Sequence, residues 1–564
     1  MTFLGPSGDN PAWYLAISRT LLFALAALAL AGAFSRPLDR RLSGRLWTAG
    51  FLALALLALV GARWPTFMVD RALDPDEAQA LAQAITALHD PIPWKSFDGN
   101  TCGPLNTYVL MLPALFGLRL SYFTTHVITV LLEFGTVAAL YEATATQFEG
   151  WLARLAIVPP VALFALVTRP EFVHYASEHL PIFLTTTALW CICVAAVKRY
   201  SPAWLFAAGV LLGMAPFSKL QSAPLDVATF AAALLLIFGS AALDARGKAA
   251  RAFALVAGAL AFPAALLAVV AANGVLYDFW MSYIQSSLAY ILWAYSPPSY
   301  LLSMQEFGLQ FDLLLAVAAA GAVALALLRG RVDRTARNAY LVSLMLLGAG
   351  VYAIFAPKRD SMHYVLFGLI PVASSAAAAL GIFAGALRST AASGIWRSLL
   401  ASGFVAGSLF VQGAFTFGWY PYLDDVREYK NRRPESVAVM IRQHLSEGDR
   451  LAIWGYRPQY FVDSYTLLGT RDAIGAYQWV AYLNPYLAYY RARYIHDFNA
   501  IRPRGFLDAG SESFDDPPWR GGNGHETFPE LAALVRRDYR LVASFRTTRL
   551  YLRRDAPQTS PAHS

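Results

Sequence analysis

The sequence is short of charge, of cysteine and of catalytic loop motifs. Charged side chains make up 15% of the 564 residues, against about 25% in a typical soluble domain. The mean hydropathy is +0.44, and this balance excludes a soluble enzyme, a disordered chain and a nucleic-acid-binding protein. The 3 cysteines are too few for a disulfide framework. The polar C-terminal part has no phosphate-binding glycine-rich loop, zinc-ligand spacing or nucleophile elbow.

The charge that is present is concentrated at the C-terminal end. Residues 419–564 hold 20 Lys and Arg and 17 Asp and Glu, which is 37 of the 82 charged residues in the chain. The preceding three-quarters is therefore far more apolar than the average composition suggests. The sequence predicts a polytopic α-helical membrane protein with a polar C-terminal domain.

Apolar runs define the predicted transmembrane region, because a bilayer-spanning helix needs roughly 20 mostly apolar residues. About twelve such runs occur, at 13–34, 46–63, 122–142, 152–168, 179–197, 203–218, 223–242, 252–272, 312–328, 338–355, 362–386 and 397–418. The expected domains are an N-terminal transmembrane hairpin (1–63), a first extracytoplasmic loop with interfacial helices (64–121), a transmembrane core (122–418) and a soluble domain (419–564).

The distribution of basic residues predicts which side each loop faces. Clusters of Arg and Lys recur in alternate loops, and the positive-inside rule assigns these loops to the cytoplasm. Residues 64–121, residues 273–311 and the C-terminal domain are then extracytoplasmic. This assignment requires that the apolar stretch 104–118 does not cross the membrane. Pro104 and Pro113 interrupt it, so we expect an interfacial or re-entrant helix there.

The C-terminal segment has the pattern of a small α/β domain. Residues 450–454, 540–545 and 549–552 are predicted to be strands, and residues 435–445 and 529–537 are predicted to be helices.

Ionisable residues at the predicted outer ends of the spans are candidates for a site, since charge is costly at membrane depth. Four groups stand out: Asp76 and Glu77 in the first outer loop, His174 and Glu178 between two spans, Lys219 at a span end, and Arg359 with His363 and Tyr364. Carboxylates can accept a proton, and cations can hold an anionic leaving group.

Each group also has a structural explanation. Asp74, Pro75 and Glu77 fit the N-cap, N1 and N3 positions of a helix start. Glu178 could cap the span that follows it, Lys219 could extend to the lipid headgroups, and the basic pair at 358–359 could lie in a solvated loop. These alternatives stay open at the level of sequence.

The order of these motifs resembles a known family of lipid-sugar-dependent glycosyltransferases with the GT-C fold. This group, similar to glycosyltransferase family 39, includes protein O-mannosyltransferases and bacterial aminoarabinose transferases. The resemblance covers roughly residues 64–470, and the motifs that carry it are Asp76-Glu77, Gly103-Pro104-Leu105, Tyr175…Glu178…Pro181, Ser218-Lys219, Lys358-Arg359…His363-Tyr364 with Pro371, and Trp454-Gly455-Tyr456…Tyr460…Ser464. The sequence departs from the pattern in its additional hairpin at 13–63 and in having Glu178 where an aspartate is frequent.

The resemblance implies transfer of a sugar from a polyprenyl-phosphate donor, with inversion at the anomeric carbon, to a lipid, glycan or protein acceptor outside the cytoplasmic membrane. Asp76 would be the general base, with Glu77 supporting it. The donor phosphate would be held by Lys219 and Arg359, next to His363 and Tyr364. Glu178 and His174 would face the acceptor or a metal, and the sequence leaves a divalent cation open.

Two other functions remain at the level of sequence. A transporter or flippase for lipid-linked saccharides would also have many spans and charged membrane residues, but it would often show internal repeats, and we find none. A non-catalytic membrane scaffold would leave the charged groups unexplained. The sequence does not identify the sugar or the acceptor, and we expect no nucleic-acid partner.

Overall fold

The protein forms two compact units, which we describe separately. The computed structural model describes residues 12–167, 170–292, 300–328, 332–358, 361–387, 393–416, 436–473, 485–510 and 524–555. The bundle unit comprises Met1–Met68, Thr129–Ala265 and Tyr295–Arg427. The sheet unit comprises Val69–Ile128, Leu266–Ala294 and Glu428–Ser564. The predicted residue Arg359 lies outside the described residues.

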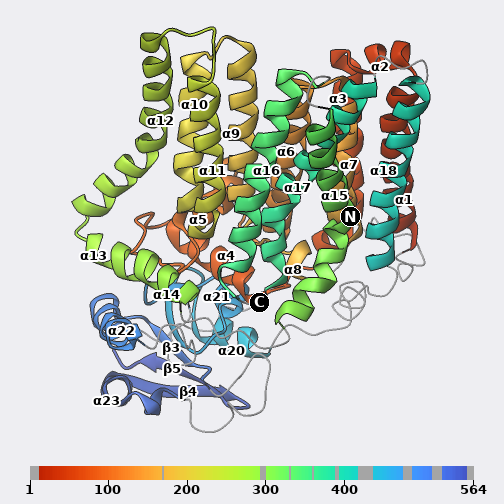
Figure 1. Cartoon of the computed structure of the whole chain (residues 1–564). Helices are drawn as coiled ribbons and strands as arrows, with labels where there is room; N and C mark the ends of the chain where they lie inside the picture. Colours follow the sequence, from red (N-terminus) through yellow and green to blue (C-terminus); the bar gives the residue numbers. More distant parts are fainter. Residues whose placement is uncertain are drawn as a thin grey trace. The chain divides into compact units, whose positions relative to one another are not determined.

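The bundle unit is built of long helices that run side by side (Figure 1). Its helices are α1 (Ala12–Phe34), α2 (Arg36–Leu42), α3 (Arg45–Phe67), α6 (Tyr122–Ala145), α7 (Gly150–Leu166), α8 (Pro170–Val173), α9 (His179–Val197), α10 (Pro202–Met214), α11 (Ala223–Phe238), α12 (Ala245–Ala272), α15 (Tyr300–Leu327), α16 (Arg334–Phe355), α17 (Leu366–Leu387) and α18 (Ser393–Thr416). Both α6 and α12 continue into the sheet unit. Three short 3₁₀ turns lie at helix ends: η2 (Ala215–Phe217), η3 (Leu220–Ser222) and η6 (Met362–Val365).

The core of the bundle unit forms around α17, which packs against α7, α15 and α16. In an 18-residue apolar stretch of Met362–Leu387, 94% of the residues are buried, whereas 22% are buried in the corresponding stretch of α12. Small side chains permit this packing, because residues 374–379 are all Ser or Ala and let neighbouring backbones approach. Gly321 of α15 shows how close the approach is, since a Cβ there would lie 2.5 Å from that of Ala379.

Among the described residues, nine helices are long and apolar enough to cross a membrane. Three further predicted spans correspond to the shorter apolar helices Gly150–Leu166, Pro202–Phe217 and Phe311–Leu327. The polytopic helical architecture is confirmed, and the count of twelve spans stays a prediction.

The segment 273–311, which the sequence places between two spans, is largely helical where the structure describes it. It contains α13 (Leu276–Asp278), a π-helical turn, η4 (Phe279–Gln285), and α14 (Ser286–Leu292), and α15 begins at Tyr300. The sequence analysis did not predict these helices, because hydropathy alone does not detect short helices that are apolar on one face. Phe279 and Tyr283 are buried, whereas Tyr277 and Trp280 are exposed.

The stretch 104–118 is a broken helix in the sheet unit. It forms α5 (Pro104–Leu110) and a 3₁₀ helix, η1 (Leu112–Phe116), which ends at Gly117 with φ +71°. At 1.5 Å per residue it is about 20 Å long, less than the roughly 30 Å of a bilayer core. Leu115 and Phe116 are 78% and 80% exposed, so the short helix presents an apolar surface that suits an interfacial position.

The sheet unit contains a five-stranded sheet in the order β2-β1-β3-β5-β4. Its strands are β1 (Arg450–Trp454), β2 (Leu467–Leu468), β3 (Gly505–Asp508), β4 (Tyr539–Phe545) and β5 (Thr548–Arg553). Strand β1 pairs in parallel with β2 and β3, while β5 is antiparallel to β3 and β4. Besides α5, η1, α13, η4 and α14, this unit contains the helices α4 (Pro75–Ala87), α20 (Ser436–His444), α21 (Gln459–Ser464), α22 (Leu487–Ile501) and α23 (Pro529–Asp538), with the 3₁₀ turn η10 (His525–Thr527).

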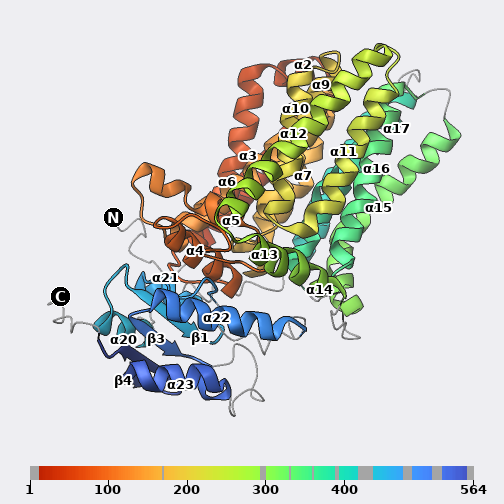
Figure 2. The ribbon, with the colours of Figure 1, turned by 90° about the vertical axis from the view of Figure 1, so that its left-hand side faces the viewer.

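An aromatic core packs α22 and α23 against the sheet. Figure 2 shows the two helices beside the strands. Trp454 of β1 lies 5.7 Å from Tyr494 and 5.8 Å from Phe528 between ring centroids, and Phe498 packs edge-on against Phe506 of β3. The three predicted strands and two predicted helices of this domain are all present. Strands β2 and β3 and helices α21 and α22 were not predicted, because β2 and β3 are too short to show a periodicity.

Candidate functional site

A buried ion pair lies where two helices of the bundle unit are interrupted. Glu178 directly precedes α9, and Lys219 lies in extended conformation between η2 and η3, where Pro216 ends the helical path of α10. The Lys219 ammonium donates to the Glu178 carboxylate and to the Ser177 hydroxyl at 2.9 Å. Glu178 is fully buried and Lys219 is 8% exposed.

Aromatic and imidazole groups surround this pair. The Tyr364 ring centroid lies 5.0 Å from the Lys219 Nζ, and His363 Nε2 lies 3.6 Å from the same Glu178 oxygen. His174 is buried and its ring stands perpendicular to that of His363 at 6.2 Å. We call Glu178, Lys219, His363, Tyr364 and His174 the lysine cluster.

The lysine cluster keeps Glu178 ionised. Burial alone would raise the pKa of the Glu178 carboxyl, but the Lys219 ammonium and His363 oppose it and bring the pKa down to about 2. Two cationic or proton-bearing groups already face one carboxylate oxygen. The arrangement therefore suits the holding of an anion beside Lys219 better than a divalent cation on Glu178.

A second buried pair supports the segment that carries Glu178. Arg63 Nη2 donates to Glu133 Oε1 at 3.0 Å, and the Arg63 guanidinium also donates to the carbonyls of Val167 and Phe172 at 3.1 Å. The sequence analysis missed this pair. A signal existed, since Glu133 is a charge inside an apolar run and intramembrane charges mark functional or positioning sites.

In the sheet unit, Asp76 and Glu77 lie in the first turn of α4 and face different surroundings. Asp74 is the N-cap, and its Oδ1 accepts from the Asp76 amide at 2.8 Å. Asp76 is exposed and accepts a hydrogen bond from the Tyr456 hydroxyl at 2.6 Å. Glu77 is buried with its carboxylate 3.1 Å from His126 Nε2. The capping role of Asp74 is thus confirmed, and Asp76 is not the residue that caps the helix.

The sheet unit also contains a buried arginine network that no sequence motif indicated. Arg493 donates to Asp98 at 2.6 Å and to both oxygens of Asp472, while Arg471 makes a two-point contact with Asp497. All five side chains are buried. The network ties residues near 98 to residues 471–497, far apart in the sequence.

Two comparisons found no match: no protein-family model and no curated protein sequence is similar to this chain. Solved structures are similar. ArnT from Cupriavidus metallidurans in the apo state has a TM-score of 0.54 at 14% identity, covering 89% of this chain and 98% of that chain. The structure of the same protein bound to undecaprenyl phosphate has a TM-score of 0.52, with the same identity and coverage. An Archaeoglobus fulgidus oligosaccharyltransferase tethered to an acceptor peptide has a TM-score of 0.43 at 13% identity, and the match covers 89% of this chain and 73% of that chain.

The chain has the GT-C fold. The fold predicted from the resemblance is therefore confirmed at a level of sequence identity where conventional sequence comparison finds nothing.

The structure brings together five of the candidate residues named from the sequence: Glu178, Lys219, His363, Tyr364 and His174. The sequence had indicated only that they lie at the same end of the spans. Asp76 and Glu77 belong to the other unit. The catalytic and binding roles assigned to all these residues stay predictions.

One further group of ligand-type side chains occurs among the described residues: Asp508, His525 and Glu526 at the carboxyl end of β3. Arg549 donates to Asp508 at 2.5 Å and to Glu526 at 2.6 Å. Hydrogen bonds from Arg549 lower the pKa of Glu526 to about 2. A guanidinium thus already pairs with these carboxylates, which makes the group poorly suited to a divalent cation.

Proposed function

We propose that this protein is a membrane glycosyltransferase that transfers a sugar from a polyprenyl-phosphate donor to an acceptor on the extracytoplasmic side of the cytoplasmic membrane. One observation carries the proposal. The match extends over 89% of this chain and 98% of ArnT, a protein whose structure has been solved with bound undecaprenyl phosphate. A donor of this class combines an apolar chain with an anionic phosphate, so its site needs a cation beside apolar helices.

The lysine cluster is our candidate for the donor-phosphate site. As the bond between the anomeric carbon and the phosphate oxygen breaks, negative charge on the phosphate increases, and a positioned cation then stabilises the transition state more than the ground state. Lys219 would supply this charge, with His363 and Tyr364 beside it. Glu178 and Ser177 would position Lys219, and Arg359 would add a second cation.

Asp76 is our candidate for the general base. In a single inverting displacement the acceptor oxygen attacks the anomeric carbon, its proton passes to a carboxylate, and the bonding electrons leave with the phosphate. Asp76 suits this role because it is exposed and because the Tyr456 hydroxyl fixes its orientation. Glu77 would hold α4 in place through His126 rather than touch the substrate.

The test replaces Asp76 with asparagine. Asp76→Asn retains the shape of the side chain but cannot accept the proton, and the loss of a general base typically costs about 10²–10⁴ in rate. Transfer from polyprenyl-phosphate sugars would be measured on purified protein. Asp74→Asn is the matched control, because asparagine is also a good N-cap and transfer should stay near wild type.

Full transfer by a well-folded Asp76→Asn protein would remove Asp76 from the mechanism while leaving the donor site to be tested through Lys219. Absence of transfer and of donor hydrolysis by the wild-type protein, with any polyprenyl-phosphate sugar offered, would contradict the proposed function as a whole.

A further inference from the structure

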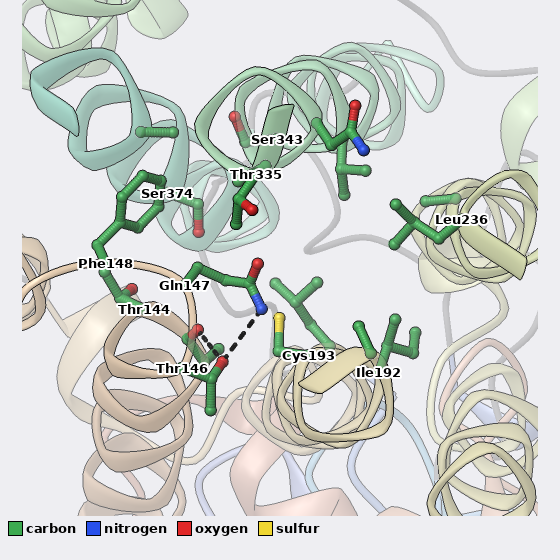
Figure 3. Close-up of a pocket in the computed structure, with 18 of the residues that line it drawn as sticks. Thr144, Thr146, Gln147, Phe148, Ile192, Cys193, Leu236, Thr335, Ser343 and Ser374 are labelled. Atoms are coloured by element: carbon green, nitrogen blue, oxygen red, sulfur yellow. Dashed lines mark hydrogen bonds between the residues drawn. The ribbon is translucent and has the colours of Figure 1, made fainter. Parts of the chain in front are cut away.

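The bundle unit has a second feature at the opposite end from the lysine cluster. A cavity of about 420 Å³ lies among α6, α9, α11, α16 and α17, and Figure 3 shows side chains from several of these helices turned toward one space. Cys193 lines it, and at 1.5 Å per residue Cys193 lies about 22 Å along α9 from Glu178. The cavity is therefore distinct from the proposed donor-phosphate site, and the inference below does not rest on the proposed function.

The inner walls of the cavity are mainly apolar, and they include the polar side chains of Thr229, Ser343 and Ser374. Leu140, Leu189, Ile192, Leu236, Val342 and Leu346 contribute the larger side chains. Along α16 the lining extends from Thr335 to Leu346, which is about 16 Å of helix. For scale, an apolar protein cavity of about 150 Å³ takes up benzene. A cavity of this volume and length suits one extended hydrocarbon chain.

Polar groups are found chiefly at one end of the cavity. Thr146 and Gln147 follow α6, and Thr335 and Asn338 lie in the first turns of α16. Gln147 donates to Thr146 at 3.4 Å, as drawn in Figure 3. Thr335 is exposed, so this polar end is the mouth of the cavity.

Basic residues flank the mouth, at the start of α16 and in the turn after α9. Arg334 and Arg337 stand on either side of Thr335 and are exposed, and exposed Lys198 and Arg199 directly precede the lining residue Tyr200. Arg251 donates to the Tyr200 carbonyl at 3.3 Å. Asp333 directly precedes α16, and its carboxylate caps the helix by accepting from the Ala336 amide. The rim therefore carries an excess of positive charge.

We propose that this cavity binds one acyl chain of an anionic phospholipid, with the phosphate headgroup at the rim formed by Lys198, Arg199, Arg334 and Arg337. The apolar depth matches the chain, the threonine, glutamine and asparagine side chains match the ester region, and the basic rim matches the phosphate. The lipid comes from the leaflet at the basic end of the helices, so this is a lipid site separate from that of a donor held at Lys219.

Binding would be measured by native mass spectrometry of the full-length protein, delipidated in detergent and titrated with phosphatidylglycerol or phosphatidylcholine. We expect phosphatidylglycerol to be retained more strongly. Each basic residue near an anionic lipid contributes about fivefold to binding. The double substitution Arg334→Gln/Arg337→Gln should therefore weaken the binding of phosphatidylglycerol by about 10–30-fold and leave the binding of phosphatidylcholine unchanged. Equal retention of the two lipids, or no effect of the double substitution, would overturn the proposal.

A thiol inside the cavity provides a second readout that needs no disruptive substitution. In a Cys102→Ser/Cys191→Ala background, Cys193 is the remaining cysteine, and its rate of modification by N-ethylmaleimide reports access to the cavity. Phosphatidylglycerol should slow this modification, and undecaprenyl phosphate should do so less if it binds at Lys219. Modification at the same rate with and without phosphatidylglycerol would show that no chain enters, and protection by undecaprenyl phosphate alone would assign the cavity to the donor instead.

Discussion

Two of the buried ionic clusters in the described part of the chain, the arginine network and the lysine cluster, differ in the kind of cation that they contain. In the sheet unit, Arg493 and Arg471 donate hydrogen bonds of 2.6–2.8 Å, two each to Asp472 and Asp497 and one to Asp98. In the bundle unit a single lysine faces Glu178, with His363 at 3.6 Å from the same carboxylate.

This difference indicates separate purposes. A guanidinium is planar and always charged, and its donors match several carboxylates in a fixed geometry, whereas an ammonium is a point charge on a flexible chain. The arginine network holds distant segments together. The lysine cluster, made of groups that can exchange protons or partners, is suited to contact a substrate anion. The predictions below test this division.

The largest effect on stability is expected from Arg493→Met. The substitution leaves Asp98 and Asp472 buried without their arginine, and breaking a buried pair in this way typically costs about 3–5 kcal/mol. Thermal unfolding of the purified protein should show a strongly lowered midpoint. Arg537→Ala is the control, because its pair with Asp538 is exposed, and exposed ion pairs contribute little to stability. Similar small effects of both substitutions would contradict the structural role of the network.

The two clusters also differ in how far the sequence predicted them. Glu178, Lys219 and His363 were identified because a charge beside an apolar span is conspicuous. Asp98, Asp472 and Arg493 lie in polar segments where charges are ordinary, and their pairing depends on contacts between residues nearly 400 positions apart. No local pattern encodes such a contact.

The same reasoning explains the successes and failures in the fold. Long apolar helices such as α9 and α17, and the strand β1, were predicted because each has a clear pattern of its own. The parallel strands β2 and β3 have 2 and 4 residues, and they become strands only by pairing with β1. The amphipathic segment from Leu276 to Leu292 was missed because its helices gain stability from packing rather than from uniform hydropathy.

The next prediction distinguishes a structural lysine from a substrate-binding one. Lys219→Met alone leaves Glu178 buried without its ammonium partner, so both stability and transfer should fall. The neutral pair Lys219→Met/Glu178→Gln removes the stranded charge and should recover most of the stability. If Lys219 holds the donor phosphate, transfer should stay low by about 10²–10³, the cost of losing a donor that stabilises developing charge.

Transfer and thermal midpoint would be measured on the three proteins side by side. Recovery of both in the double variant would mean that the lysine cluster serves the fold alone. Recovery of stability without transfer is the outcome that the proposed donor site requires.

The smallest expected effect is on the pH dependence of stability. The pKa of Glu178 is about 2 in the folded protein, against about 4.3 for an unperturbed glutamate. Because the folded pKa is depressed, the ion pair stabilises the protein fully above the unfolded value, and this contribution is lost as pH falls toward the folded value. Stability from the pair should therefore be constant between about pH 5 and 8 and should decline below about pH 4, by about 1–2 kcal/mol at pH 3. Thermal midpoints from pH 3 to 8 would be compared for wild type and Lys219→Met/Glu178→Gln.

The double variant should retain the decline caused by other carboxylates, such as Glu526 beside Arg549, and lose the part due to Glu178. Parallel profiles for the two proteins would show that Glu178 does not depend on Lys219 for its charge, and the contrast between the two clusters would then rest on the arginine network alone.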